Sequence, residues 1–373
     1  MNYFKVLLVT ASVCYSVTAF SQKTADAYLK KATAQSMEGM YKEAVENYNK
    51  AIAINDDDPT SFYARAQAKG ELADYEGAIK DYSMAIDLKP DYAEAYFQRG
   101  YIKDLMANYE GAIKDFDSAI KLNPDYYLAY QNRATAKDKI GDFSGAVEDY
   151  SKAILSKPDY YTFLNRGKSN YELKNYSGAL QDYSKAIDVN ANDYEVYYLR
   201  GFAKVGLKEY ADAIKDFDKA LELKGEDPKI FNAKAWAEIS MNDLKAAFGT
   251  LNYAVELKWD YADSYFNRAY ARNEIQDYEL AVADLNRAID LNPDYFKAYN
   301  LRGEMKGKLN DNKGELADYN KAIELKPDFA VAYYNRGIAK TKTADKAGSC
   351  ADFEQAKKLG YAKAEQILNE YCK

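Results

Sequence analysis

The chain has 373 residues, of which 48% are hydrophobic and 29% are charged, and this is the composition of a folded protein rather than a disordered linker. Its formal net charge of -7 argues against nucleic acid and anionic membranes as partners, because phosphate binding needs a basic surface. The sequence has no histidine, which excludes Ser-His and Cys-His nucleophilic sites and almost every catalytic zinc site, and leaves carboxylates, lysines and tyrosines as possible catalysts.

Residues 1–21 have the features of a secretory signal peptide. Lys5 supplies a positive charge, and Val6 to Phe20 form an uncharged, mostly apolar run that is too short for a stable membrane anchor. Ala19 and Ser21 are small residues at the -3 and -1 positions of a cleavage site. We therefore expect cleavage after Ser21, which makes Gln22 the first residue of the mature chain.

Two other interpretations of this segment are an uncleaved anchor and a lipoprotein signal that uses Cys14. The lipoprotein signal is the weaker one, because Cys14 lies inside the apolar run and follows the bulky Val13. No other stretch of the chain approaches roughly 18 consecutive apolar residues. We expect a secreted or periplasmic protein that does not insert into a membrane after signal cleavage.

A small residue that follows a basic one recurs along the rest of the chain. Successive copies are 34 residues apart, except for one spacing of 33. Only a repeat array produces such a register. These ten marker residues are Ala32, Ala66, Gly100, Ala134, Gly167, Gly201, Ala235, Ala269, Gly303 and Gly337.

Each copy also has an aromatic residue four positions before the marker and an alanine nineteen positions after it, as in Tyr96, Gly100 and Ala119. Further apolar residues at helical spacing follow the marker, such as Tyr109, Ala112 and Phe116 in the third copy. The pattern predicts a hairpin of two antiparallel helices, which cross closely where the marker of one helix faces the alanine of the other.

Each second helix ends in Leu-Lys-Pro-Asp or a variant, where the proline disfavours helix in the residue before it and the aspartate can cap the next helix. The hairpins therefore join without linkers. One hairpin cannot bury its apolar stripe alone, so we expect an all-α solenoid of ten repeats over residues 22–361, without a domain boundary, and a capping helix in residues 362–373.

The pattern resembles the tetratricopeptide repeat (TPR), and the resemblance covers about residues 25 to 360. It implies a right-handed superhelix whose first helices line a concave groove for peptides or partner helices. The segment from Cys350 to Cys372 resembles the closing unit of secreted bacterial TPR proteins. Repeat seven departs from the pattern with Leu244 and Leu251, and repeat nine with Asn312 and Glu315. The third copy carries the resemblance through Tyr96, Gly100, Tyr109, Ala112, Phe116, Ala119 and Pro124.

Arginine precedes the marker in eight copies, and the same eight copies have aspartate fifteen residues after it, as in Arg99 and Asp115. The two copies with lysine instead, Lys31 and Lys234, lack this aspartate. The matched loss predicts an Arg to Asp pair that links the two helices of each hairpin. A row of catalytic acids is the alternative, but a cationic partner lowers a carboxyl pKa, which is the wrong direction for a general acid.

We call the aromatic residue four positions before each marker the anchor aromatic. The residue directly after it lies in the groove that the TPR resemblance implies. Carboxylate-clamp TPR domains, which bind the C-terminal Asp of chaperones, have lysine at this position. None of the ten copies in this chain has lysine there, which disfavours that class of partner. Aromatic residues at this position and one helical turn later predict an aromatic groove, and asparagines two residues after the anchor resemble a row that binds peptide backbone in some TPR proteins. The candidate groove residues are Tyr63, Phe97, Tyr101, Asn132, Asn165, Tyr198, Phe202, Trp236, Phe266, Asn267, Tyr270 and Asn335. The alternative is that these aromatics pack against adjacent repeats and that the asparagines are solvated.

Cys350 and Cys372 remain once the signal peptide is removed, and an even number of cysteines in an oxidising compartment favours a disulfide. The chain offers no residues for a metal or cofactor site and no catalytic set that stands apart from the repeats. We expect a non-enzymatic adaptor of the bacterial envelope that binds a peptide or a partner helix. A structural subunit that assembles through its end repeats or outer face is the alternative, and an enzyme that uses carboxylates is the third.

Overall fold

The computed structural model describes residues 23–372. The predicted signal peptide, its cleavage after Ser21 and the alternative role of Cys14 lie outside the described residues. The described part is helical throughout its regular structure and contains no strand. Within residues 23–372, no helix is both long and apolar enough to cross a membrane.

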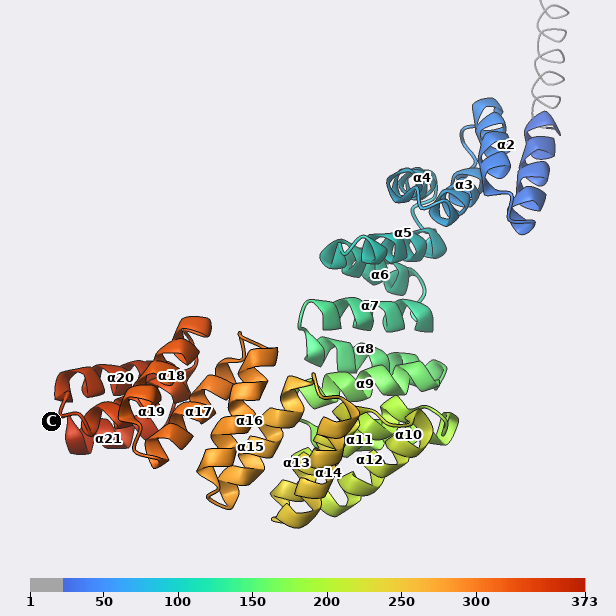
Figure 1. Ribbon diagram of the computed structural model, residues 1–373. Coiled ribbons are helices and arrows are strands. Elements are labelled where there is room, and N and C mark those ends of the chain that lie inside the picture. Colours follow the sequence, from blue (N-terminus) through green and yellow to red (C-terminus); the bar gives the residue numbers. More distant parts are fainter. Residues whose placement is uncertain (1–22, 373) are drawn as a thin grey trace, which may run out of the picture. The chain divides into compact units, whose positions relative to one another are not determined.

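Contacts between residues divide the described part of the chain into two compact units, the first ending at Val189 and the second beginning at Asn190. The described part of the first unit contains five hairpins, which begin with a helix over residues 23–37 (Figure 1). Its other helices are α2 (Tyr41–Ile54), α3 (Pro59–Glu71), α4 (Tyr75–Leu88), α5 (Ala93–Leu105), α6 (Tyr109–Leu122), α7 (Tyr127–Lys139), α8 (Phe143–Ser156), α9 (Tyr160–Glu172) and α10 (Tyr176–Val189).

The described part of the second unit contains five more hairpins and a single final helix, α21, close to the predicted position (Figure 1). Its helices are α11 (Tyr194–Gly206), α12 (Tyr210–Lys224), α13 (Pro228–Ser240), α14 (Leu244–Leu257), α15 (Ala262–Glu274), α16 (Tyr278–Leu291), α17 (Phe296–Lys308), α18 (Asn312–Leu325), α19 (Ala330–Thr341), α20 (Lys346–Lys358) and α21 (Lys363–Tyr371).

The turn inside every hairpin has the same backbone conformation. The residue seven positions after each marker has a positive φ, between 58° and 81°, and only Gly39 and Gly141 are glycines there. The other eight copies accept a left-handed conformation that costs roughly 1 to 2 kcal/mol in a residue with a Cβ atom. An aspartate or asparagine usually follows, and its side chain caps the second helix, as when Asn108 accepts a hydrogen bond from the Gly111 N–H at 3.1 Å.

The marker glycines make room for an aromatic ring, whereas we had predicted that small residues face each other. A Cβ atom added to Gly201 would lie 2.5 Å from the Phe217 ring, and one added to Gly100 would lie 2.9 Å from the Phe116 ring. Both rings are fully buried. The later alanine lies elsewhere, since Ala119 shares a core cluster with Ala129 of the following hairpin. Inside a hairpin, the missing side chain of the marker glycine therefore leaves space for the aromatic ring. Between hairpins, small residues such as Ala119 and Ala129 allow the helices to pack closely.

The predicted Arg–Asp pairs are present in all eight copies. Arg99 donates from Nε and Nη2 to the two carboxylate oxygens of Asp115, at 2.9 and 2.7 Å, and Asp115 is only 4% exposed. Lys103, one turn after Arg99, contacts the same carboxylate at 2.7 Å. The Arg99 Nη1 donates to Ser83 of the preceding hairpin at 3.0 Å. Each of these arginines thus links the two helices of its own hairpin, and most of them also donate a hydrogen bond to the preceding hairpin.

Repeats one and seven have other residues at the positions of the Arg–Asp pair and of the second cation. In repeat one, Asn47 donates to Gln35 at 2.7 Å, so an amide pair replaces the ion pair. In repeat seven, Glu238 occupies the position of the second cation, and its Oε1 lies 4.0 Å from Lys234. The Oε2 atom of Glu238 is buried without a hydrogen-bond partner among the described residues.

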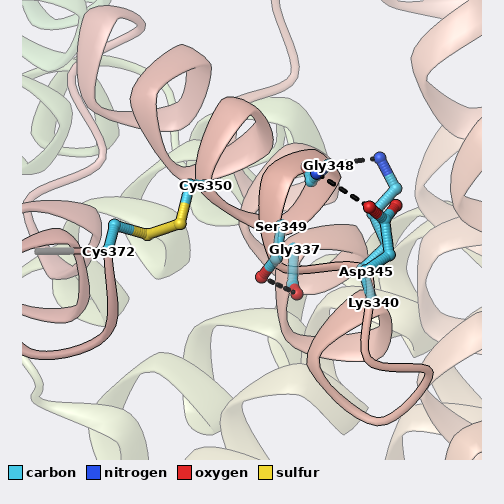
Figure 2. Close-up of a disulfide and its surroundings, with 7 residues drawn as sticks. All are labelled: Gly337, Lys340, Asp345, Gly348, Ser349, Cys350 and Cys372. Carbon is cyan, nitrogen blue, oxygen red and sulfur yellow. Dashed lines mark hydrogen bonds between the residues drawn. A yellow bond between two sulfur atoms is a disulfide. The ribbon is translucent and has the colours of Figure 1, made fainter.

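The chain end is held by a disulfide between Cys350 of α20 and Cys372, with sulfur atoms 2.00 Å apart and Cα atoms 5.7 Å apart, as the two-cysteine count predicted. Figure 2 shows this bond beside the start of α20, where Ser349 donates to the Gly337 carbonyl of α19 at 2.7 Å. The disulfide fixes the C-terminal end of α21 to α20.

Candidate ligand-binding groove

The first helices of repeats six to nine form an open cavity of about 490 Å³ in the second unit. Residues of α11, α13, α15 and α17 line it. Five of its lining residues belong to the set that the sequence predicted, namely Tyr198, Phe202, Trp236, Phe266 and Asn267. The structure therefore brings together the predicted residues of three successive repeats on one face.

The floor of this cavity is aromatic. The Tyr198 and Phe202 rings meet edge to face at a centroid distance of 4.8 Å, and Phe202 rests on the buried Phe217 at 5.5 Å. Trp236 is 38% exposed and packs on Tyr270 at 5.2 Å. These rings are supported from below and remain open above, which is the arrangement of a rigid apolar binding surface.

A chain of amides crosses the cavity between repeats. Asn232 donates from Nδ2 to the Pro228 carbonyl at 2.7 Å and to the Ser264 hydroxyl at 2.8 Å. Its Oδ1 accepts a hydrogen bond from Asn267 at 2.9 Å. Asn267 belongs to the predicted groove set, whereas Asn232 does not, because it stands directly after the anchor aromatic and the predicted asparagine row stands two residues after it. The amides hold α13 and α15 together under the aromatic surface.

Charged residues that were not among the predicted groove residues lie at the first turns of the helices that line the cavity. Lys229 of α13 and Lys297 of α17 line the cavity and are exposed. Asp263 of α15 also lines it and is hydrogen-bonded to the hydroxyls of Tyr261 and Tyr295. Burial, followed by the effects of Asp263, raises the pKa of both tyrosines, so they stay neutral donors to this carboxylate.

The predicted groove residues of the first unit do not form one surface. Phe97, which we expected to be partly exposed, is only 7% exposed, because its ring packs on Phe116 and on Tyr126 of the next hairpin, with centroid distances of 5.8 and 4.9 Å. It is a core residue. Tyr63 is half-buried and stacks on Tyr92 at 5.0 Å, and its burial raises its pKa to about 12. Tyr101 is 41% exposed, as expected.

The asparagines of the predicted row have different partners. Asn132 donates to the Leu128 carbonyl of its own helix at 2.8 Å. Asn335 donates to Asn300 of the preceding repeat at 3.1 Å, which repeats the Asn267–Asn232 arrangement. Asn165 lines a separate polar cavity of about 300 Å³ together with Asp138. Neither the full backbone-binding row nor full solvation describes the set.

Two carboxyl groups that line other cavities, Asp138 in the first unit and Glu304 in the second, have a raised pKa, mainly through burial. Asp138 accepts hydrogen bonds from Tyr150 at 2.9 Å and from Ser169 at 2.7 Å, and these bonds oppose the increase. Glu304 lies in a cavity of about 350 Å³ with Glu315, whose carboxylate pairs with Lys342 at 3.0 Å. Among the described residues, no group of three or more cysteine and carboxylate side chains could hold a metal ion.

The stacked hairpins define an all-α helical repeat protein. The chain belongs to the tetratricopeptide repeat proteins. Family models described as TPR repeat match residues 37–72 and 71–103, and models described as tetratricopeptide repeat match 93–126, 132–195, 194–227, 262–295 and 296–329. Two of the described hairpins lie wholly outside these ranges, residues 228–261, where Glu238 replaces a cation, and residues 330–358.

Solved structures share this fold at low sequence identity. Yeast Tom70 is 16% identical with a TM-score of 0.56, and the alignment covers 92% of this chain and 94% of that one. The APC/C hetero-tetramer Cut9-Hcn1 is 12% identical with a TM-score of 0.51, and the alignment covers 94% of this chain and 96% of that one. The C-terminal part of a TPR protein from Cytophaga hutchinsonii is 19% identical with a TM-score of 0.50, and the alignment covers 73% of this chain and 98% of that one. A search among curated proteins found no match. The shared fold is one that typically serves as a scaffold for protein–protein interaction.

Proposed function

We propose that the protein is a non-enzymatic scaffold that binds a peptide or an exposed helix of a partner protein in the groove of its second unit. The observation that carries this proposal is the open aromatic surface of Phe202, Trp236 and Phe266, which three successive first helices present to one cavity. Tyr270 supports this surface through its ring contact with Trp236. Aromatic side chains of this kind bury large apolar areas against a ligand and are common binding hot spots.

The proposal includes export of the protein to the bacterial envelope, which rests on residues 1–21. Mass spectrometry of the secreted or periplasmic fraction tests it, with Gln22 as the expected first residue. An intact Met1 on protein from the cytoplasmic fraction contradicts the proposed export.

Peptide selection on the purified mature protein tests the binding function. A displayed peptide library is expected to yield ligands whose affinity falls at least about tenfold in Trp236→Ala and in Tyr270→Ala, while both melting temperatures stay near that of wild type. Phe217→Ala is the matched control, because this ring is fully buried and its loss is expected to cost about 3 to 5 kcal/mol of stability. Ligands that bind both groove variants as tightly as wild type contradict the proposed groove.

A structural subunit is the second candidate function, and the first described helix favours it. Met37 is 84% exposed and lines an open cavity of about 500 Å³ with Leu29 and Ala34. Such an apolar surface at an array end suits contact with another chain. Sedimentation that shows concentration-dependent association of wild type but not of Met37→Glu, together with no selected peptide, favours this function over the first.

A further inference from the structure

The position two residues before the anchor aromatic is acidic in several repeats and basic in only two. Glu94, Glu195 and Asp263 occupy it in repeats three, six and eight. An acid there is favourable, because it lies in the first turn of a helix, at the positive end of the helix dipole. Lys229 and Lys297 occupy the same position in repeats seven and nine. Both lysines add to the positive end of their helix, so helix stability does not explain them.

These two lysines line the same cavity, on either side of the repeat that contributes Asp263. Within the part of the chain that the structure describes, neither ammonium group has an ion-pair partner. The single carboxylate of the cavity, Asp263, is already engaged by the hydroxyls of Tyr261 and Tyr295. The cavity therefore offers two cations and one satisfied anion, in a chain whose net charge is -7.

The same cavity contains the aromatic surface and the amide chain. Trp236 and Phe266 provide apolar area, and Asn267 keeps its Oδ1 available, since only its Nδ2 is used by Asn232. An amide oxygen in a groove is a suitable acceptor for a peptide N–H. The cavity thus combines an apolar contact, a backbone acceptor and two cations.

We propose that the ligand of this groove is an extended acidic peptide segment, in which one aromatic or large aliphatic side chain is flanked by carboxylates. The apolar side chain packs on Trp236, and the carboxylates pair with Lys229 and Lys297. The proposal rests on the proposed function of the groove and specifies the chemistry of its partner. Charge-assisted pairs at a partly exposed site contribute modestly to affinity but strongly to the choice of partner.

Fluorescence anisotropy with the full mature protein and labelled synthetic peptides tests this chemistry. The peptides share a central tryptophan and differ only in its flanking residues, which are all Glu, all Gln or all Lys. The Glu peptide is expected to bind roughly tenfold more tightly than the Gln peptide at low ionic strength, and the difference is expected to shrink with added salt. The Lys peptide is expected to bind most weakly.

Variants assign the preference to the two lysines. Lys229→Gln and Lys297→Gln are each expected to reduce the Glu-over-Gln ratio, and the double variant to abolish it, without weakening the Gln peptide. Lys313→Gln is the matched control, because it makes the same charge change at an exposed lysine of α18 that does not line the cavity. Lys229→Glu with Lys297→Glu is expected to make the Lys peptide the preferred ligand.

Failure of this inference differs from failure of the proposed function. Equal affinity for the Glu and Gln peptides, with both lost in Trp236→Ala, overturns the acidic preference and leaves the aromatic groove in place. A Glu preference that survives the double lysine variant also overturns the inference. No binding of the Glu peptide at millimolar concentration overturns it as well, and the library selection then decides on the groove itself.

Discussion

Arg99 and Asp115 come from opposite helices of one hairpin and form a two-point pair, in which the guanidinium binds both oxygens of a carboxylate that is 4% exposed. Seven other hairpins repeat the pair with the same sequence separation. Because Asp115 is buried and has a second cation in Lys103, removing the arginine leaves a carboxylate that is only partly compensated.

We expect Asp115→Ala to cost about 3 to 5 kcal/mol, because it leaves two cations next to the core without their anion. Arg99→Ala is expected to cost less, and the double variant to show a coupling of about 1 kcal/mol or more. Urea denaturation of the four proteins measures this cycle. The exposed pair Asp212–Lys215, with atoms 2.7 Å apart, is the control and is expected to show no measurable coupling. Additive effects at Arg99 and Asp115 contradict the pair's role.

Gly201→Ala is expected to destabilise the second unit by about 1 to 3 kcal/mol, because the new Cβ atom would lie 2.5 Å from the buried Phe217 ring. Gly249→Ala is the matched control. It is also a helical glycine of the second unit, but nothing lies within 4 Å of its added Cβ atom, so it is expected to gain up to about 1 kcal/mol. Thermal denaturation followed by circular dichroism compares the two. Equal effects of the two substitutions would mean that the Phe217 ring moves aside freely.

Glu238→Gln is expected to raise the melting temperature at neutral pH. Burial raises the pKa of Glu238 above its ordinary value of 4.5, and Oε2 has no hydrogen-bond partner among the described residues. The folded state then holds the proton more tightly than the unfolded state, so wild type loses stability as the pH rises from about 4.5 through the raised pKa. The advantage of the variant is therefore expected to be small near pH 4 and largest at neutral pH, roughly 1 to 3 kcal/mol.

Glu315→Gln is the control for this pH series, because Glu315 is as buried as Glu238 but pairs with Lys342 at 3.0 Å. It is expected to lower the melting temperature at neutral pH. If both substitutions change stability in the same direction, the missing hydrogen-bond partner of the Glu238 Oε2 atom is not the cause.

Reduction of the Cys350–Cys372 disulfide is expected to loosen α21 and leave the rest of the second unit folded. The bond closes a loop with a sequence separation of 22, which stabilises the folded state by about 3 kcal/mol in the chain-entropy model. Hydrogen exchange with and without reductant is expected to show faster exchange confined to α21 and α20. Intact protein should weigh two hydrogens less than its reduced form, and two free thiols in unreduced material would falsify the disulfide.

The repeat register predicted the helices, their turns and the Arg–Asp pairs, because these depend on residues at a fixed separation inside one hairpin. Ten copies act as their own comparison, so the loss of arginine at Lys234 and of aspartate at Thr250 could be seen together. The spacing alone did not identify what the marker faces. The same glycine can face an alanine or a ring, and only the packing shows that Gly201 lies against Phe217.

The groove was harder to predict, because exposure depends on the neighbouring repeat. Phe97 and Phe266 occupy equivalent positions, yet only Phe97 is buried, between Phe116 and Tyr126. Lys229 and Lys297 were missed for a different reason. Lysines are common on helix surfaces, and these two become distinctive only when the fold places them in one cavity.

The arginines that reach the preceding hairpin also determine how the second unit responds to a pulling force. Arg268, Arg302 and Arg336 each donate to an asparagine one hairpin back, at 3.0, 2.8 and 2.7 Å. Repeat seven has only Lys234, with a single contact to Asp218 at 2.7 Å. Under tension applied along the array, the last four hairpins would hold together as one block, and the unit would first extend at the junction before α13. The ligand groove spans that junction, so a bound segment would contact the hairpins on both sides of it and resist their separation.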